Sequence, residues 1–307
     1  MVNALKKGKE MVTKDGYVKI VKRNFKQTKK ALPSKEELFC LYTFSKQTLS
    51  ELSQEHHLKT STIQNLFDKI TVPDKIHNPR NLSLVVDTTF FDDFAVVVFR
   101  DQKNKECLWW KFTDKEALKY YYEGRLYLEK LGYTFRSITG DGLPGLPSVF
   151  HGIPFQYCHF HAKQNIRRYI TKNPQTKAGI ELKFIMDNLE NYTHESFLKD
   201  ITNWDLKYDS FLKERTYHPG GTWSYTHGRL RGAVRSMKRM SKYLFTYQGY
   251  SFFVPVTTNT LEGFFSHLKV RVGAHRGICT IRKKKLVELI LLNSSSIFKK
   301  GMCKKLF

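Results

Sequence analysis

The stretch SLVVDTTF at residues 83–90 decides the fold predicted from this sequence. It belongs to an apolar, β-branched run over 82–87, and a second such run follows over 94–99. A polar break at Asp92 and Asp93 separates the two, a pattern typical of a β-hairpin. These two acids are best explained as turn residues. Residues 107–112 give a third strand.

Working outward, the chain alternates between helical and strand periodicity. An amphipathic stretch over 114–131 ends at a glycine and predicts a helix. A strand over 134–138, a short helix over 146–150 and a strand over 155–158 follow. Three antiparallel strands followed by helix, strand, helix and strand are typical of an RNase H-like fold. We therefore predict an α/β core built on a mixed five-stranded sheet.

The remaining segments are helical or basic. Residues 34–72 predict three short helices, the last opened by Thr60 and Ser61, with Ile63 and Phe67 on its apolar face. This pattern predicts a helix-turn-helix DNA-binding domain; a plain helical bundle packed on the next domain is the alternative. The predicted division is a basic arm at 1–33, the helix-turn-helix at 34–72, a catalytic domain at 80–295 with a helical insertion at about 163–255, and a basic tail at 296–307.

Charge indicates the class of partner. Lysines and arginines number 52 against 28 acids, a net charge of +24, which favours a polyanion such as nucleic acid, although a merely basic or ribosome-associated protein has the same composition. Five scattered cysteines without a Cys-x-x-Cys pair do not form a disulfide framework. Apolar runs too short to span a bilayer, and a lysine-rich start without an apolar signal segment, predict a protein of the cytoplasm with no membrane partner.

Three carboxylates are candidates for a metal site. Asp87 and Asp141 each end an apolar strand, and Glu262 opens a helix in TTNTLEGFF with Thr260 as its expected cap. Carboxylates that converge from rigid elements bind Mg²⁺, and a pair of such ions catalyses phosphodiester chemistry. Taken singly, each aspartate is equally explained as a turn residue or cap, and Glu262 as an acid favoured by the helix dipole.

Five motifs occur in an order that resembles a known family. They are VVDTTFF at 85–91, ITGDG at 138–142, YCHFHAKQNI at 157–166, TTNTLEGFFSHLK at 257–269 and AHRG at 274–277. Together they resemble bacterial insertion-sequence transposases of the Mutator-like type, the insertion-sequence-256 family in its variant form, over about residues 35–295. The resemblance implies that Asp87, Asp141 and Glu262 are the Asp–Asp–Glu triad. It also implies a long helical insertion before the glutamate.

The resemblance carries further expectations about the site. It implies two Mg²⁺ or Mn²⁺ ions on the triad and a Cys-x-x-His signature at Cys158 and His161. These two residues, with Asn259 and His275, are expected to support the active site. Zinc is not expected, because no second Cys/His pair stands at ligand spacing. The variant relatives often begin with a zinc ribbon, whereas no cysteine precedes Cys40 in this chain.

The function implied is DNA transposition in the bacterial cytoplasm, at the nucleoid. Double-stranded DNA, as element ends and as target, is the expected partner of a homodimer or higher oligomer. A structure-specific nuclease on the same fold and a non-catalytic DNA-binding protein derived from a transposase are the alternatives. Residues expected to contact DNA are polar or basic: Thr60, Ser61, Thr62, Gln64, Asn65, Arg167, Arg168, Arg229, Arg231, Arg235, Lys238, Arg239 and Lys242.

Overall fold

The computed structural model describes residues 32–295, and residues from Lys35 onward cluster as one compact unit. The predicted basic tail at 296–307, and all but the last two residues of the predicted arm at 1–33, lie outside this range. Among the described residues, no helix has both the length and the apolar character needed to cross a membrane.

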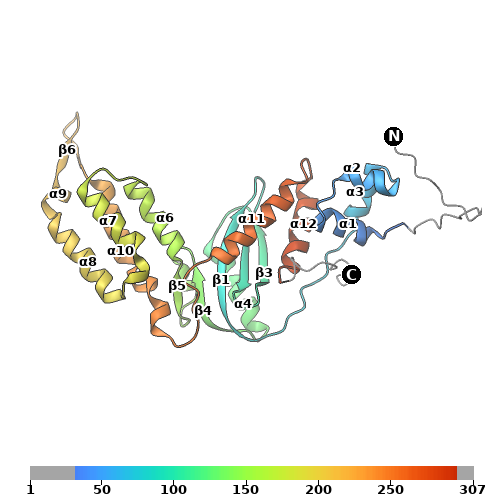
Figure 1. Cartoon of the computed structure of the whole chain (residues 1–307), viewed down its shortest axis with the longest axis horizontal. Helices are drawn as coiled ribbons and strands as arrows, with labels where there is room; N and C mark the ends of the chain where they lie inside the picture. Colours follow the sequence, from blue (N-terminus) through green and yellow to red (C-terminus); the bar gives the residue numbers. More distant parts are fainter. Residues whose placement is uncertain (1–31, 296–307) are drawn as a thin grey trace, which may run out of the picture. The chain divides into compact units, whose positions relative to one another are not determined.

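A five-stranded mixed sheet forms the centre of the unit (Figure 1). The strand order is β3-β2-β1-β4-β5, in which β1–β3 are antiparallel neighbours and β4 and β5 run parallel to β1. This confirms the predicted mixed sheet and is consistent with an RNase H-like core. The strands are β1 (Asn81–Phe90), β2 (Ala95–Asp101), β3 (Glu106–Thr113), β4 (Thr134–Gly140) and β5 (Phe155–Tyr157).

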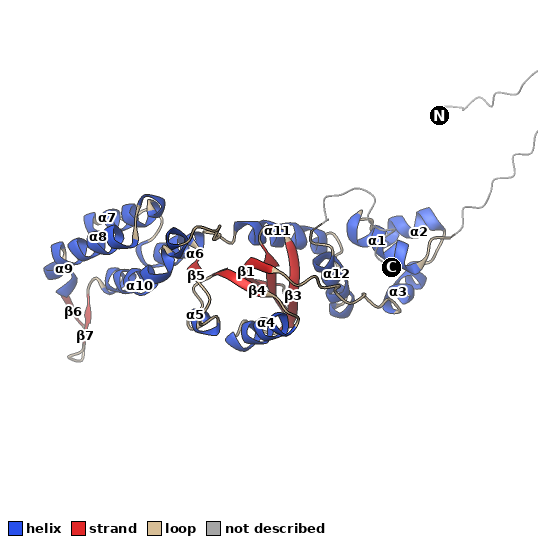
Figure 2. Ribbon diagram, turned by 90° about the horizontal axis from the view of Figure 1, so that it is seen from below, coloured by secondary structure: helices blue, strands red, loops and turns tan. Residues whose placement is uncertain are grey.

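Helices cover both faces of this sheet, as Figure 2 shows. Alternation along β1 explains why: Leu84 and Val86 pack with α4 (Leu118–Lys130) and α5 (Leu146–Val149), whereas Val85 points to the opposite face. That opposite face packs against α11 (Asn259–Gly273) and α12 (Thr280–Leu292). Both faces of β1 are therefore buried, in agreement with its nearly unbroken apolar sequence.

The three predicted N-terminal helices are present as α1 (Lys35–Phe44), α2 (Leu49–His56) and α3 (Thr60–Asp68). They share one hydrophobic cluster with α11, α12 and the sheet, and Arg282 of α12 binds both carboxylate oxygens of Asp68. The prediction that Thr60 and Ser61 cap the start of the third helix is wrong. Lys59 occupies the N-cap position and makes no side-chain cap, while Thr60 and Ser61 are already helical.

The insertion is mainly helical, as predicted, and has its own hydrophobic core with Trp204 buried in it. It also contains a β-hairpin that was not predicted from the sequence, although HPGG at 218–221 is a turn signal. Its elements are α6 (His159–Ile170), α7 (Lys177–Asp187), α8 (His194–Lys207), α9 (Asp209–Lys213), β6 (Arg215–Tyr217), β7 (Trp223–Tyr225) and α10 (Gly228–Leu244), with short 3₁₀ turns at Leu189–Asn191 and Thr246–Gly249.

After the insertion, the chain returns to the sheet through residues 253–258, which we call the return segment. The Ser83 hydroxyl donates to the Phe253 carbonyl at 2.9 Å, and the Thr139 hydroxyl donates to the Pro255 carbonyl at 2.6 Å. Because Ser83 lies on β1 and Thr139 on β4, the return segment is fixed across two adjacent strands. It leads directly into α11.

We predict that Thr139→Val lowers the free energy of unfolding by about 1–3 kcal/mol, because the Pro255 carbonyl loses its donor in a buried place. Valine keeps the volume and the strand propensity, so the loss reports the hydrogen bond. Thr134→Val, at an exposed position of the same strand, is the matched control and should change stability little. Equal urea midpoints for the two variants would contradict the role assigned to the return segment.

Candidate active site

Asp87 and Asp141 are neighbours across the parallel pair β1/β4. Val85 of β1 lies opposite Thr139 of β4, and the same register carried two residues further places Asp87 beside Asp141. Adjacent strands are about 4.8 Å apart, so the two carboxylates emerge close together. Asp141 directly follows β4, as predicted, but Asp87 does not end its strand. β1 continues to Phe90 because its pairing with β2 extends beyond the end of β4.

The carboxylate of Asp87 is almost fully buried, with 8% of the residue exposed. Burial raises its pKa to about 7; the charge of His161 opposes this rise, and the charges of Asp141 and Glu262 add to it. The backbone N–H of Thr88 donates to Asp87 Oδ1 at 2.8 Å. The carboxylates of Asp141 and Glu262 are therefore close enough to Asp87 to repel its negative charge.

Glu262 reaches this place from the first turn of α11. The Thr258 hydroxyl donates to Glu262 Oε1 at 2.7 Å, which orients the carboxylate. Thr258, rather than the predicted Thr260, is the N-cap residue. Thr260 lies inside the helix, where its hydroxyl donates to Gln102 Oε1 at 2.6 Å and its carbonyl accepts from the buried Arg100 at 2.6 Å.

Cys158 and His161, which were predicted to support the active site, lie next to Glu262. The Cys158 sulfur is 3.3 Å from the Thr258 hydroxyl, and His161 Nε2 is 3.7 Å from Glu262 Oε1. Burial would raise the pKa of Cys158, but hydrogen bonds to His161 and Thr258 outweigh it and lower that pKa. Burial would lower the pKa of His161, but Cys158 and the nearby carboxylates raise it to about 9. The two side chains thus favour each other's charged forms.

Of the other two residues predicted to support the site, Asn259 lies near Glu262 and His275 does not. Asn259 is exposed at the first residue of α11, one turn before Glu262. His275 lies beyond the opposite end of that helix, roughly 20 Å along the chain from Glu262 at 1.5 Å per residue. It is buried against Tyr42 with ring centroids 3.7 Å apart. The structure does not bring His275 to the carboxylates.

A fourth acid, Glu116, approaches the site and was not predicted from the sequence. Tyr121 donates a hydrogen bond to the Glu116 carboxylate, and its hydroxyl is 2.9 Å from that of Thr88. Burial and the charge of Asp141 raise the pKa of Glu116. The sequence predicts a helix from residue 114, which would include Glu116, but α4 begins only at Leu118 and Glu116 lies in the connection between β3 and α4.

Tyr157 and Arg239 also border the site. A Cβ at position 142 would lie 1.5 Å from the Tyr157 hydroxyl, so only glycine fits after Asp141. Burial and the charge of Asp141 raise the pKa of Tyr157 to about 12, and Arg239 opposes that rise. Arg239 was predicted to contact DNA, and the structure places it close enough to Tyr157 for its charge to act on that residue. The glycine that follows Asp141 is thus explained by its close packing against Tyr157.

The remaining residues predicted to contact DNA differ in their surroundings. On α3, Gln64 is half-buried, whereas Thr60, Ser61, Thr62 and Asn65 are exposed. Within the insertion, Arg229 donates to the Arg168 carbonyl, Arg231 to the Leu212 carbonyl, Arg167 pairs with Asp187 and Lys238 pairs with Asp205. The side chains of Arg168, Arg235, Arg239 and Lys242 are exposed, with no acidic partner within 4.0 Å among residues 32–295. They are the bases most available for phosphates.

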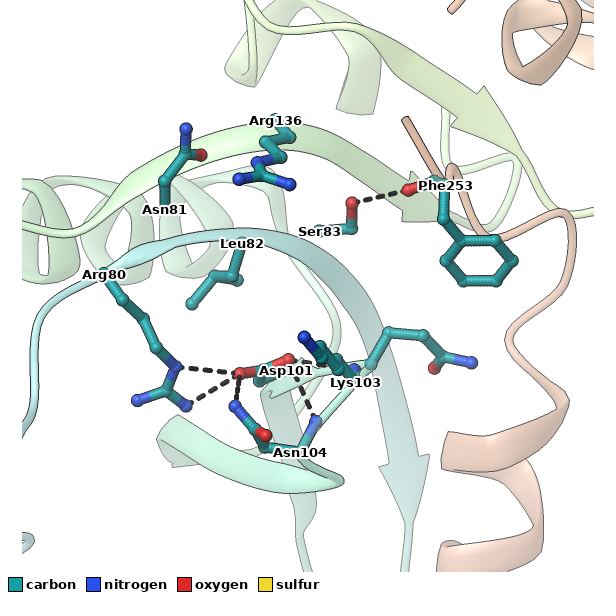
Figure 3. A pocket seen from close by; sticks show the side chains of 10 residues that line it. Arg80, Asn81, Leu82, Ser83, Asp101, Lys103, Asn104, Arg136 and Phe253 are labelled. Carbon is teal, nitrogen blue, oxygen red and sulfur yellow. Dashed lines mark hydrogen bonds and ion pairs between the residues drawn. The ribbon is translucent and has the colours of Figure 1, made fainter. Parts of the chain in front are cut away.

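A pocket of about 580 Å³ lies near the other end of β1, away from the carboxylates (Figure 3). Asp101 is at its floor, where both the Arg80 guanidinium and the Asn104 side chain donate to it. Because this acid is already neutralised by Arg80, the pocket lacks the free carboxylates that mark the site on β1 and β4.

We predict that Asp87→Asn stabilises the metal-free protein at pH 8. Because the folded-state pKa of Asp87 is raised to about 7, the stability that its carboxyl contributes is present at low pH and is lost as pH rises from about 4 to 7. The variant should gain up to about 4 kcal/mol at pH 8, at about 1.4 kcal/mol per pKa unit, and nothing at pH 4. Urea unfolding in EDTA at both pH values measures this, and a pH-independent difference would contradict it.

Comparison with known proteins finds similarity to solved structures but none at the level of sequence families. No family model matches the chain, and no curated protein matches it. Two of the matching solved structures, both at low identity, illustrate this similarity. One is a simian T-cell lymphotropic virus intasome in complex with the PP2A regulatory subunit B56 gamma (14% identity, TM-score 0.22, 63% of this chain and 73% of that one). The other is a Drosophila P element transposase strand transfer complex (12% identity, TM-score 0.41, 86% of this chain and 92% of that one).

Proposed function

We propose that this chain is a DNA transposase that cleaves and joins phosphodiester bonds at a divalent metal site formed by Asp87, Asp141 and Glu262. One observation carries the proposal. Two aspartates on adjacent strands and a glutamate 121 residues further along the chain meet at one end of the sheet. Because buried like charges destabilise a fold, such a cluster points to a cation-dependent role.

The donor set fits Mg²⁺ or Mn²⁺. All three groups offer carboxylate oxygens, the hard ligands that these ions prefer. Burial is the main cause of the raised pKa of Asp87, and the charges of Asp141 and Glu262 add to it; a bound cation would stabilise the ionised carboxylate against both effects. Two bound ions would supply an activated attacking oxygen and stabilise the leaving oxygen.

The chain's own residues would position the reactants. The Thr258 hydroxyl holds Glu262, and Gly142 leaves space for Tyr157 beside Asp141. The imidazolium of His161 lies within reach of the same carboxylates and would attract a DNA phosphate. Arg239 lies on the insertion side of the site, where an extended duplex would meet it. These groups orient DNA, while the carboxylates hold the ions.

The exposed surfaces suggest how DNA is held. The polar face of α3 is free to read a major groove, as a helix-turn-helix would, and the exposed bases of α10 are suited to phosphates. Joining two element ends to a target would require a dimer or a higher oligomer. Within this proposal, the chain is an insertion-sequence transposase of the insertion-sequence-256 type, acting at terminal inverted repeats in the bacterial cytoplasm.

We expect Asp87→Asn, Asp141→Asn and Glu262→Gln each to lower metal-dependent DNA cleavage by at least about a hundredfold, because each removes a charged metal ligand. DNA binding should stay within about threefold of the parent. The assay uses DNA carrying the inverted repeats that flank the gene, with Mg²⁺. Asp101→Asn, which changes an acid outside the site, is the matched control provided that it folds.

The same assay separates the alternatives. A structure-specific nuclease would cut branched DNA without inverted repeats and would not join ends, and a non-catalytic DNA-binding protein would bind but not cut. Cleavage by the Asp87→Asn protein at near the parent rate would overturn the proposed site.

We expect Arg235→Ala and Lys242→Ala each to flatten the salt dependence of DNA binding. The slope of log K against log salt should fall by about 0.9 for each phosphate that the variant no longer binds. Lys238→Ala is the matched control on the same helix, because Lys238 is already paired with Asp205 and should change the slope less. Binding titrations at several salt concentrations measure the slopes. Equal effects of the three substitutions would exclude α10 as a specific phosphate-binding face.

A further inference from the structure

Cys158, His161 and Glu262 form a second set of potential metal ligands that overlaps the triad. The Cys158 sulfur, a ring nitrogen of His161 and a carboxylate oxygen of Glu262 all lie within 4.8 Å of one another. They come from the start of α6 and the start of α11, two rigid elements. Ligand spacing in the sequence indicates only the Cys/His pair, because Glu262 is remote from it along the chain and joins it only in the folded protein.

The distances fit one tetrahedral ion after small side-chain rotations. Two ligand atoms on a zinc ion are roughly 3.4 to 3.6 Å apart, given bond lengths of about 2.0 to 2.3 Å. His161 Nε2 and Glu262 Oε1 are 3.7 Å apart in the structure. The side chains of His161 and Glu262 are 24% and 28% exposed, which leaves an entry path and an open fourth position. Cys158 is fully buried and forms the floor.

We propose that Cys158, His161 and Glu262 bind one soft divalent cation, Zn²⁺, and that this ion competes with the hard ions of the triad for Glu262. A thiolate and an imidazole select Zn²⁺ or Co²⁺ over Mg²⁺, whereas the carboxylates of Asp87 and Asp141 do not. One carboxylate shared between the two sets makes the soft ion an inhibitor of Mg²⁺-dependent chemistry. The competition rests on the proposed function, but the binding of the soft ion does not.

Cobalt titration of the full-length protein tests the site directly. Co²⁺ is added to metal-free protein in a thiol-free reductant, and the thiolate-to-cobalt charge-transfer absorption in the near ultraviolet is recorded. We expect one equivalent of Co²⁺ to saturate the band and Zn²⁺ to abolish it. Cys158→Ser should lose the band, whereas Cys107→Ser, also buried, and Cys279→Ser, exposed, should retain it.

A second variant covers the possibility that Cys158→Ser does not fold. His161→Gln changes a partly exposed ligand and should raise the Co²⁺ dissociation constant at least about tenfold, with a native circular dichroism spectrum. A parent protein without the band, or a folded Cys158→Ser protein that keeps it, would overturn the soft-metal site. An unchanged Co²⁺ affinity in folded His161→Gln would do the same.

Magnesium competition tests the shared ligand. Millimolar Mg²⁺ should raise the Co²⁺ concentration needed for half-saturation in the parent and should have no such effect in Asp87→Asn. If Mg²⁺ does not shift the titration of a parent protein that cleaves DNA, the sharing of Glu262 is wrong. If the cobalt band depends on Cys158 but the protein cleaves no DNA, the proposed function fails and the soft-metal site stands.

Discussion

The hydrogen bonds that fix the return segment to the sheet are the constraint on which the site depends. Glu262 follows Asp141 by 121 residues, and most of that length is an insertion with a separate core. Ser83 and Thr139 bind the carbonyls of Phe253 and Pro255, so the chain comes back over β1 and β4. The start of α11, and with it Glu262, is therefore placed by the same two strands that carry the aspartates.

This placement concentrates negative charge in a buried region, which costs stability. The carboxylate of Asp87 is both desolvated and close to two other acids, and its pKa is raised to about 7. The surroundings offset part of this cost, because the imidazolium of His161 lies among the carboxylates and the Thr258 hydroxyl satisfies Glu262. Clusters of buried acids whose electrostatic cost is only partly offset are typical of functional sites rather than of residues that only stabilise the fold.

The sequence alone predicts the five strands and places Asp87 and Asp141 on or directly after two of them, because strand alternation and glycines at turns are local signals. Asp87 and Asp141 are adjacent as soon as β1 and β4 are parallel neighbours. Glu262 was a candidate as an acid that opens a helix, but motif resemblance was needed to group it with the two aspartates, since no local pattern encodes a contact across 121 residues. The same limit explains why His275 was grouped with the site although it packs on Tyr42, and why Glu116 was missed. These positions are decided by tertiary packing.

The insertion can be long without disturbing the site because its two ends meet. The His159 ring and the Gln156 side chain both bind the carbonyl of Leu244, at 2.7 and 2.8 Å, so the last residue of α10 is fixed beside the start of α6. Between these anchors the entropic cost of chain length grows only slowly, and the helices pack on their own core. Arg239 lies little more than one turn before Leu244, and this anchoring explains how an arginine of the insertion comes near Tyr157 at the edge of the site.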